Sequence, residues 1–317
     1  MREALFVKQH SEKWQHYDSM QKANPDEVAN QFIEITNDLA YSKTFYPNSK
    51  TTAYLNGLAA KLHQSVYKNK KEKSNRFIHF WKTELPLIFL QHRKQVFYAL
   101  FFFLISCAIG ALSAKYDDTF VRLIMGDGYV NMTNENIAKG DPFGVYKQDN
   151  PFIMFLQIGS NNIFVALYTF VLGILFSFGS IVSLFRNGIM LGSFQYFFFS
   201  KGLGFQSVLV IWIHGTLEIS AIVLAGAAGL ILGNSFLFPR TYTRMASVLK
   251  GAKDGLKIVI GLIPIFIVAA FFESFVTRHT EMPLWLSISI LLSSAAFITW
   301  YVFIYPIKVH HKQPTLN

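Results

Sequence analysis

The sequence predicts an all-α, polytopic membrane protein with six transmembrane helices, a cytoplasmic helical N-terminal region and an interfacial helix between them. Hydrophobic residues make up 52% of the chain and charged residues only 15%, whereas soluble domains usually carry about 25% charge. Several apolar stretches approach the roughly 20 residues that a membrane-spanning helix requires. Basic residues cluster beside these stretches, as is typical of cytoplasmic loops and of contact with anionic lipid headgroups.

Residues 1–76 are polar and are predicted to form a small cytoplasmic helical domain. Two apolar stripes with a spacing of three or four residues indicate a helical hairpin. These stripes consist of Val28, Phe32, Ile35 and Leu39, and of Leu55, Leu58, Leu62 and Val66. No apolar run lies near Met1, so we expect no cleavable signal peptide. A basic linker, residues 68–73, follows the second stripe.

Residues 77–95 are aromatic and amphipathic but too short to span a bilayer. We predict an interfacial helix that lies along the cytoplasmic headgroups and is kinked at Pro86. A fourth helix of the soluble bundle is the alternative. The remaining residues, 96–317, are predicted to form the six-span membrane domain.

The six predicted spans are residues 96–114, 162–185, 187–200, 207–233, 258–276 and 284–305. A polar segment, residues 115–157, separates the first two spans and is predicted to be extracytoplasmic, with turns and a short helix. The third span would rise only about 21 Å, less than the roughly 30 Å of the hydrocarbon core. If it did not cross, the basic loop 240–257 would be extracytoplasmic, against the positive-inside rule. We therefore expect a thin third span, both termini in the cytoplasm and a location in the inner (cytoplasmic) membrane.

The most informative polar residues are His214 and Glu218, which lie four apart inside an apolar run. This spacing places both side chains on one face of a helix. Ionisable residues within a membrane span are costly and usually functional. Two interpretations remain open: a hydrogen-bonded pair that maintains helix packing, or a site coupled to a proton or a ligand.

Other polar residues are expected near the same outward-facing end of the spans. Glu273 lies close to the outer end of the fifth span, and Arg278 follows it as a possible counter-charge. Asn161 and Asn162 begin the second span. The sequence therefore predicts an outward-facing polar cavity formed by His214, Glu218, Glu273, Asn161, Asn162 and Arg278.

No catalytic motif is recognisable around these residues. The zinc protease pattern His-Glu-x-x-His is absent, and so are a serine nucleophile elbow and a phosphate-binding loop. The single cysteine, Cys107, excludes an intramolecular disulfide and a metal site built from cysteines. We expect that the protein is not an enzyme and that it binds no cofactor and no metal ion. The one histidine and two carboxylates, His214, Glu218 and Glu273, are nevertheless compatible with a metal ion. The basic patches carry no nucleic-acid recognition motif.

Small residues at intervals of four predict close helix packing within the membrane. They are Ala221, Ala225, Gly229 and Gly233 in the fourth span and Gly188 and Gly192 in the third. His214 and Glu218 extend nearly the same stripe, so we expect this pair to face protein rather than lipid.

The segment Ile213-His214-Gly215-Thr216-Leu217-Glu218 resembles the central His-Gly-x-x-Glu motif of the stage II sporulation protein M family. Weaker matches are Asn161-Asn162, Gly188-Ile189-Met190-Leu191-Gly192, Glu273-Ser274-Phe275-Val276-Thr277 and, near the N-terminus, Trp14 and Tyr54-Leu55-Asn56-Gly57-Leu58. Family members usually have Pro where this chain has Arg278. The resemblance implies an integral membrane protein. The member that gives the family its name anchors a peptidoglycan-degrading complex in spore formers.

These observations favour a non-enzymatic membrane scaffold or subunit of a cell-envelope complex of the peptidoglycan-remodelling type. The alternative is a transporter or lipid-handling permease whose polar cavity contains His214, Glu218 and Glu273. The expected partners are membrane lipids, other envelope membrane proteins and a second copy in a homodimer, but not nucleic acid.

Overall fold

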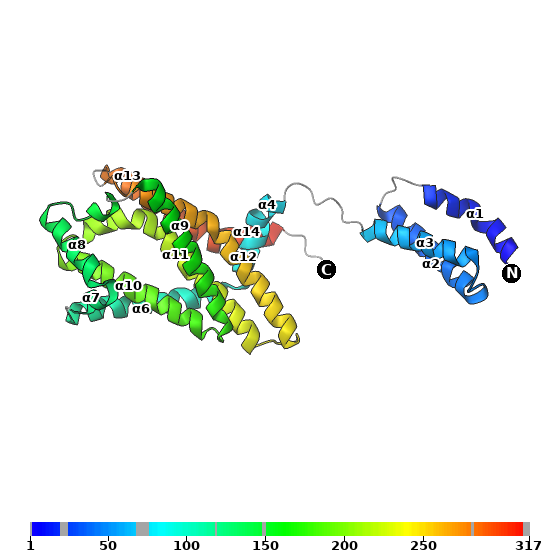
Figure 1. Cartoon of the computed structure of the whole chain (residues 1–317), viewed down its shortest axis with the longest axis horizontal. Helices are drawn as coiled ribbons and strands as arrows, with labels where there is room; N and C mark the ends of the chain where they lie inside the picture. Colours follow the sequence, from blue (N-terminus) through cyan, green and yellow to red (C-terminus); the bar gives the residue numbers. More distant parts are fainter. Residues whose placement is uncertain are drawn as a thin grey trace. The chain divides into compact units, whose positions relative to one another are not determined.

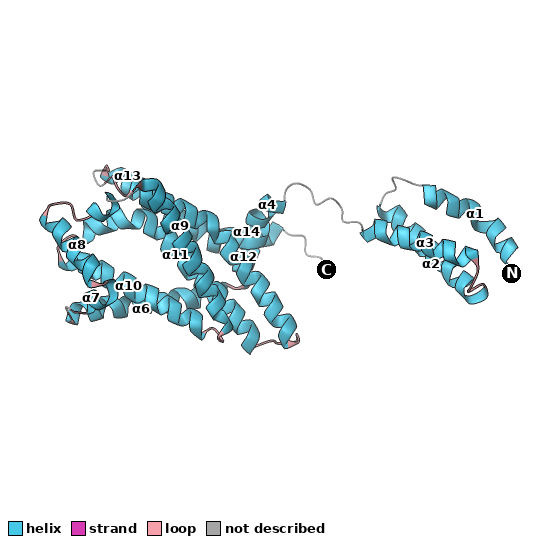
Figure 2. Ribbon diagram, viewed as in Figure 1, coloured by secondary structure: helices cyan, strands magenta, loops and turns pink. Residues whose placement is uncertain are grey.

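The computed structural model describes residues 2–19, 25–67, 76–117, 119–147, 150–279 and 282–312. These residues form helices joined by short loops, and no strand occurs among them (Figure 2). The chain divides into two compact units, Met1–Arg76 and Phe77–Asn317, which we describe separately. The predicted basic linker, residues 68–73, lies outside the described residues.

The first unit contains α1 (Glu3–Ser19), α2 (Pro25–Phe45) and α3 (Lys50–Tyr67) (Figure 1). Its core includes Ile35 and Leu55, which are both fully buried, together with Trp14. The indole nitrogen of Trp14 donates a hydrogen bond of 2.8 Å to the Asp38 carboxylate. Both predicted stripes lie on helices, although the side chain of Val66 is not described.

Five helical stretches among the described residues are long and apolar enough to cross a membrane. They are α6 (Arg93–Tyr116), α9 (Pro151–Val171) with the 3₁₀ turn η3 (Leu172–Ile174), α11 (Gly204–Leu237), α12 (Arg244–Phe271) with the π-helical η4 (Phe272–Val276), and α13 (Leu284–Thr299) with the π-helical η5 (Trp300–Ile304) and α14 (Tyr305–Lys312). The central helix is α11, because α6, α9, α12 and α13 all pack against it (Figure 1).

A sixth long helix, α10 (Phe178–Ser200), packs along α6 and corrects the predicted boundaries of two spans. We predicted spans at residues 162–185 and 187–200, but the chain turns at 175–177, where Phe176 and Ser177 have positive φ values of 55° and 71°. The apolar run continues through this turn, so hydropathy does not mark it. With 23 residues, α10 is about 35 Å long and is not a thin helix. Its polar residues nevertheless lower its mean hydropathy, so α10 is not one of the five apolar stretches.

Two predicted loops also contain helices. The basic residues of 240–257 lie mostly on the first turns of α12, which begins at Arg244 rather than at residue 258. The segment 115–157 forms α7 (Phe120–Met125), α8 (Asp127–Ala138) and the 3₁₀ turn η2 (Gly144–Lys147), and its last residues belong to α9. Phe143 stacks on Phe198 of α10 with a ring-centroid distance of 5.4 Å, so this segment is folded onto the helix ends.

The second unit begins within α4 (Arg76–His79) and continues with the π-helical η1 (Phe80–Glu84) and α5 (Leu85–Gln91). One face of these segments packs against α12. Leu85 is 1% exposed and lies against Gly261 of α12. The indole nitrogen of Trp81 donates a hydrogen bond of 3.3 Å to the Gly261 carbonyl. The predicted interfacial helix is therefore shorter than residues 77–95, because α6 already begins at Arg93.

Candidate functional site

The polar residues of α11 lie in its N-terminal half, at a point where η4 approaches. His214 is only 4% exposed, and its Nδ1 atom lies 3.0 Å from the Thr277 hydroxyl. That hydroxyl donates its proton to the Phe272 carbonyl at 3.1 Å. The Thr277 oxygen must therefore accept from Nδ1–H, and a neutral imidazole then presents the lone pair of Nε2.

A π-helical turn positions the second residue of the site, Glu273. The Thr277 backbone N–H bonds to the Phe272 carbonyl five residues earlier at 2.8 Å. Single π-helical turns inside α-helices often occur at functional sites, because they redirect side chains. Here Glu273 and Thr277 both point to His214, and the Glu273 Oε1 atom lies 3.8 Å from His214 Nε2.

Glu218 completes a cluster of three potential ligands. One donor atom from each of His214, Glu218 and Glu273 lies within 4.8 Å of the other two. The described residues show no hydrogen bond between His214 and Glu218; the hydrogen-bond partner of the imidazole is Thr277. The interpretation of these two residues as a hydrogen-bonded pair is therefore wrong in its geometry, although both side chains face protein.

Asn162 of α9 lies beside the cluster, and its amide is directed to the Glu218 carboxyl group. It is 5% exposed, and its Nδ2 atom has no hydrogen-bond partner of normal geometry. Asn161 contributes indirectly, because its amide donates to the Asn162 oxygen at 3.4 Å. Arg278 is directed elsewhere: its guanidinium donates to the Lys147 carbonyl at 3.4 Å, and Arg278 does not line the pocket.

The cluster opens into a pocket of about 340 Å³, which we call the polar pocket. It lies between α11, α10, η4 and the segment that forms α7, α8 and η2. Its lining residues include Tyr129, Tyr146, Leu191, Trp212, His214, Glu218, Ile219 and Glu273. The rings of Tyr146 and His214 meet edge to face, with 5.8 Å between their centroids.

Tyr129 and Tyr146 are neutral hydrogen-bonding groups at physiological pH. Burial raises the pKa of Tyr129 to about 12. Burial, followed by the negative charge of Glu273, raises the pKa of Tyr146 well above its usual value. Sequence reasoning missed both tyrosines and Thr277. Only Thr277 left a signal, because it lies within the Glu273-Ser274-Phe275-Val276-Thr277 segment.

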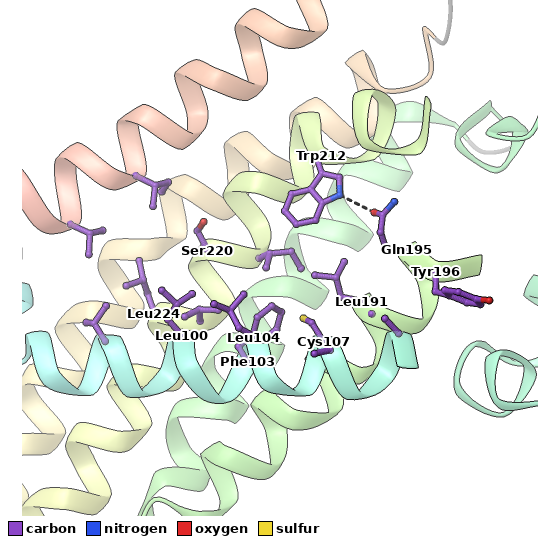
Figure 3. Close-up of a pocket in the computed structure, with 18 of the residues that line it drawn as sticks. Leu100, Phe103, Leu104, Cys107, Leu191, Gln195, Tyr196, Trp212, Ser220 and Leu224 are labelled. Carbon is purple, nitrogen blue, oxygen red and sulfur yellow. Dashed lines mark hydrogen bonds between the residues drawn. The ribbon is translucent and has the colours of Figure 1, made fainter. Parts of the chain in front are cut away.

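A second and larger cavity adjoins the polar pocket. This apolar groove has a volume of about 840 Å³ and lies between α6, α10, α11 and the α13–η5 helix (Figure 3). Leu100 and Leu104 line it from α6, and Leu224 from α11. Three residues, Leu191, Trp212 and Ile219, line both the groove and the polar pocket. The two cavities therefore adjoin at these side chains.

The small residues predicted for helix packing lie at close helix contacts. A Cβ atom at Gly188 or Gly192 would collide with α6, at Ser106 and at the Cys107 carbonyl. A Cβ atom at Gly229 would meet Ser180, and one at Gly233 would meet Ser177. Ala221 and Ala225 are fully buried. These contacts hold α6, α10 and α11 around the two cavities.

The fold and the site define a polytopic helical membrane protein with a polar pocket enclosed among its helices. Comparison with known families shows which one. The family model Stage II sporulation protein M matches residues 99–278, more than half of the chain, so the protein belongs to this family and the resemblance is confirmed. The N-terminal unit matches a separate model, a domain of unknown function (DUF8413), over residues 4–68. No curated protein and no solved structure matches the chain.

Proposed function

We propose that this member of the stage II sporulation protein M family binds an amphiphilic lipid of the cell envelope. The acyl chain lies in the apolar groove, and the polar head lies at the polar pocket. One observation carries this proposal: the two cavities share the side chains of Leu191, Trp212 and Ile219. The lipid-handling alternative requires a cavity that reaches His214 and Glu218, and both residues line the polar pocket. A purely structural bundle needs no such cavity.

The groove has the size and the walls that an acyl chain requires. Its volume of about 840 Å³ lies within the usual range of small-molecule sites, about 300–1,000 Å³. Both α6 and α13 pack on α11, and the groove lies between them. At one end Phe303 of η5, which lines the groove, meets Phe97 of α6, with 5.4 Å between ring centroids.

The opposite end of the groove carries polar groups. Trp212 donates a hydrogen bond of 2.9 Å to the Gln195 side chain, as Figure 3 shows. Gln195 in turn donates to the Ser207 hydroxyl at 2.7 Å. The exposed Lys115 of α6 lines this same end and supplies a positive charge suited to a lipid phosphate. An apolar cavity with a cationic, hydrogen-bonding end matches a phospholipid more closely than a fully apolar or a fully soluble ligand.

The first test is photolabelling with phosphatidylglycerol that carries a diazirine on its acyl chain, in vesicles containing the intact protein. We expect labelled peptides from the groove, in particular around Leu100 and Leu224. Ala108→Trp fills the groove from α6, and Ser220→Phe fills it from α11. Either side chain occupies volume that the acyl chain needs. Groove labelling should therefore fall, roughly tenfold for each ~1.4 kcal/mol of lost binding free energy.

The matched control is Ala296→Trp, because Ala296 is exposed on α13 and does not line the groove. This variant should label like the unaltered protein. Equal groove labelling in Ala108→Trp and Ala296→Trp, with both proteins folded by circular dichroism, would refute the proposal. Labels confined to exposed faces such as Leu292 would also refute it.

The proposal includes six spans in the cytoplasmic membrane, with both termini in the cytoplasm and α10 as the sixth span. The envelope scaffold expected from the family resemblance is a second candidate. In its favour is the first unit, Met1–Arg76, which has a core of its own and is suited to hold a partner. Crosslinking in cells tests the scaffold: loss of all protein partners when residues 2–67 are removed supports it, and unchanged partners contradict it.

A further inference from the structure

We infer that His214, Glu218 and Glu273 form a binding site for one divalent transition-metal ion in the polar pocket. This inference goes beyond lipid binding and does not depend on it. The donor set is one imidazole nitrogen and two carboxylate groups. His214 and Glu218 lie on α11, and Glu273 lies on η4, more than 50 residues after Glu218 in the sequence. One donor atom from each residue lies within 4.8 Å of the other two.

The distances suit ligands of a single ion. Ligands that lie about 2.0–2.2 Å from zinc are themselves about 3–4 Å apart. The 3.8 Å between His214 Nε2 and Glu273 Oε1 falls in this range and is too long for a hydrogen bond. For ligation, the three donor atoms, which lie within 4.8 Å of one another, must approach to about 3–4 Å.

The hydrogen bonding of His214 prepares it as a ligand. Thr277 accepts from Nδ1–H, which leaves the Nε2 lone pair directed to Glu273. Metal-bound histidines almost always donate their other ring N–H in this way, and the second group fixes the ring orientation. Thr277 is therefore a positioning residue, and the π-helical turn η4 places it one turn after Glu273.

The charge of the pocket points to a cation. Buried carboxylates are normally paired with a positive group or bound to a metal. Among the described residues that line the pocket, none is Lys or Arg, so His214 is the one basic side chain that faces Glu218 and Glu273. The Asn162 amide, which is directed to Glu218, is neutral and balances neither carboxylate charge. A divalent ion balances both carboxylates.

The donor set selects the class of metal. Imidazole favours Zn²⁺, Cu²⁺, Fe²⁺ and Ni²⁺, and carboxylates favour Mg²⁺, Ca²⁺ and Mn²⁺, so the mixed set fits Zn²⁺ or Mn²⁺. Three protein ligands leave a fourth position that faces the pocket, as in sites where zinc binds an exchangeable molecule. The oxygen of a phosphate headgroup suits that position, and this last step alone rests on the proposed function.

Equilibrium dialysis with Zn²⁺ tests the site in the purified, EDTA-stripped, full-length protein. The C-terminal His310 and His311 are an independent zinc-binding hazard, so every variant carries His310→Asn and His311→Asn. We expect one Zn²⁺ per chain, and X-ray absorption should show one imidazole, oxygen ligands and no sulfur. Glu218→Gln combined with Glu273→Gln should abolish binding, and Thr277→Val should weaken it about 10–100-fold.

Glu135→Gln is the matched control, because Glu135 is exposed on α8 and lies outside the pocket. It should bind Zn²⁺ like the parent. No binding by the folded parent, or binding that survives Glu218→Gln with Glu273→Gln, overturns the site; two carboxyl groups that share a proton would give the first result. The conservative Thr277→Ser, which keeps the hydroxyl group, should restore the affinity lost in Thr277→Val.

A second arm separates this site from the proposed function. With Zn²⁺ bound, photolabelling by phosphatidylglycerol should increase, whereas labelling by diacylglycerol, which lacks the phosphate, should not change. Zinc binding with unchanged phosphatidylglycerol labelling overturns only the headgroup step. Zinc binding without any groove labelling refutes the proposed lipid function and leaves the metal site supported.

Discussion

At the scale of single residues, glycines of the same helix differ sharply in what surrounds them. A Cβ atom at Gly229 of α11 would collide with the Ser180 hydroxyl and lie 2.9 Å from the Thr169 carbonyl. A Cβ atom at Gly215 would meet nothing within 4 Å. Close packing of small residues is a main source of helix association in lipid, so Gly229 contributes to stability and Gly215 does not.

Gly229→Ala should therefore destabilise the protein by about 1–3 kcal/mol, the usual cost of overpacking. Gly215→Ala should be neutral or stabilise α11 by up to about 1 kcal/mol, because Ala is the better helix former. Thermal unfolding of both variants in the same detergent measures the difference. Equal melting temperatures would contradict the close packing of α10 on α11.

His214 and Glu218 could be predicted as site residues from the sequence, because ionisable residues are rare in apolar helices. Their neighbours could not. Thr277 reaches the imidazole only because η4 adopts a π-helical turn, and no residue type specifies such a turn. Tyr146 reaches the same ring only because residues 119–147 fold back onto the helix ends. Arg278 was placed in the cavity from its sequence position alone, and its side chain points to Lys147.

At the scale of helices, apolar character predicts that a helix exists better than it predicts where the helix ends. The turn at 175–177 lies inside an apolar run that contains no proline and no charged residue. It is produced by tertiary contacts, since Gly173 lies against Gly229 and Ser177 donates to the Leu230 carbonyl at 3.3 Å. The start of α12 was also misplaced. Basic residues between 244 and 257 are typical of cytoplasmic loops, although here they lie on the helix.

The segment from α4 to α5 provides a prediction at the helix scale. Leu85 is 1% exposed and rests on α12, whereas Ile78 is 50% exposed. Leu85→Ala should destabilise the bundle by about 2–5 kcal/mol, as other large-to-small core substitutions do. Ile78→Ala should change stability by less than about 0.5 kcal/mol. Unfolding in detergent measures both, and equal effects would mean that this segment lies free in the headgroup region.

At the scale of the whole molecule, membrane topology depends on whether α10 crosses the bilayer. Its buried serines and Arg186 lower its hydropathy, yet its 23 residues suffice for about 35 Å. The serines face neighbouring helices, whereas Arg186 is exposed: the Ser180 hydroxyl donates to the Thr169 carbonyl at 2.6 Å, and Ser193 donates to the Gly110 carbonyl at 3.3 Å. Polar groups that are satisfied inside a bundle do not prevent a helix from spanning.

We therefore predict that Glu135 of α8 and Lys250 of α12 lie on opposite sides of the membrane. If α10 crosses, the first turns of α12 are cytoplasmic, in agreement with the positive-inside rule, while α8 is extracytoplasmic. If α10 does not cross, α11 runs in the opposite direction and both residues are extracytoplasmic. Cys107 is the only cysteine, so a Cys107→Ala background allows single-cysteine labelling. An impermeant maleimide applied to intact cells should label Glu135→Cys and leave Lys250→Cys unlabelled until the cells are lysed. Labelling of both variants before lysis would remove α10 from the spans and exclude the six-span topology.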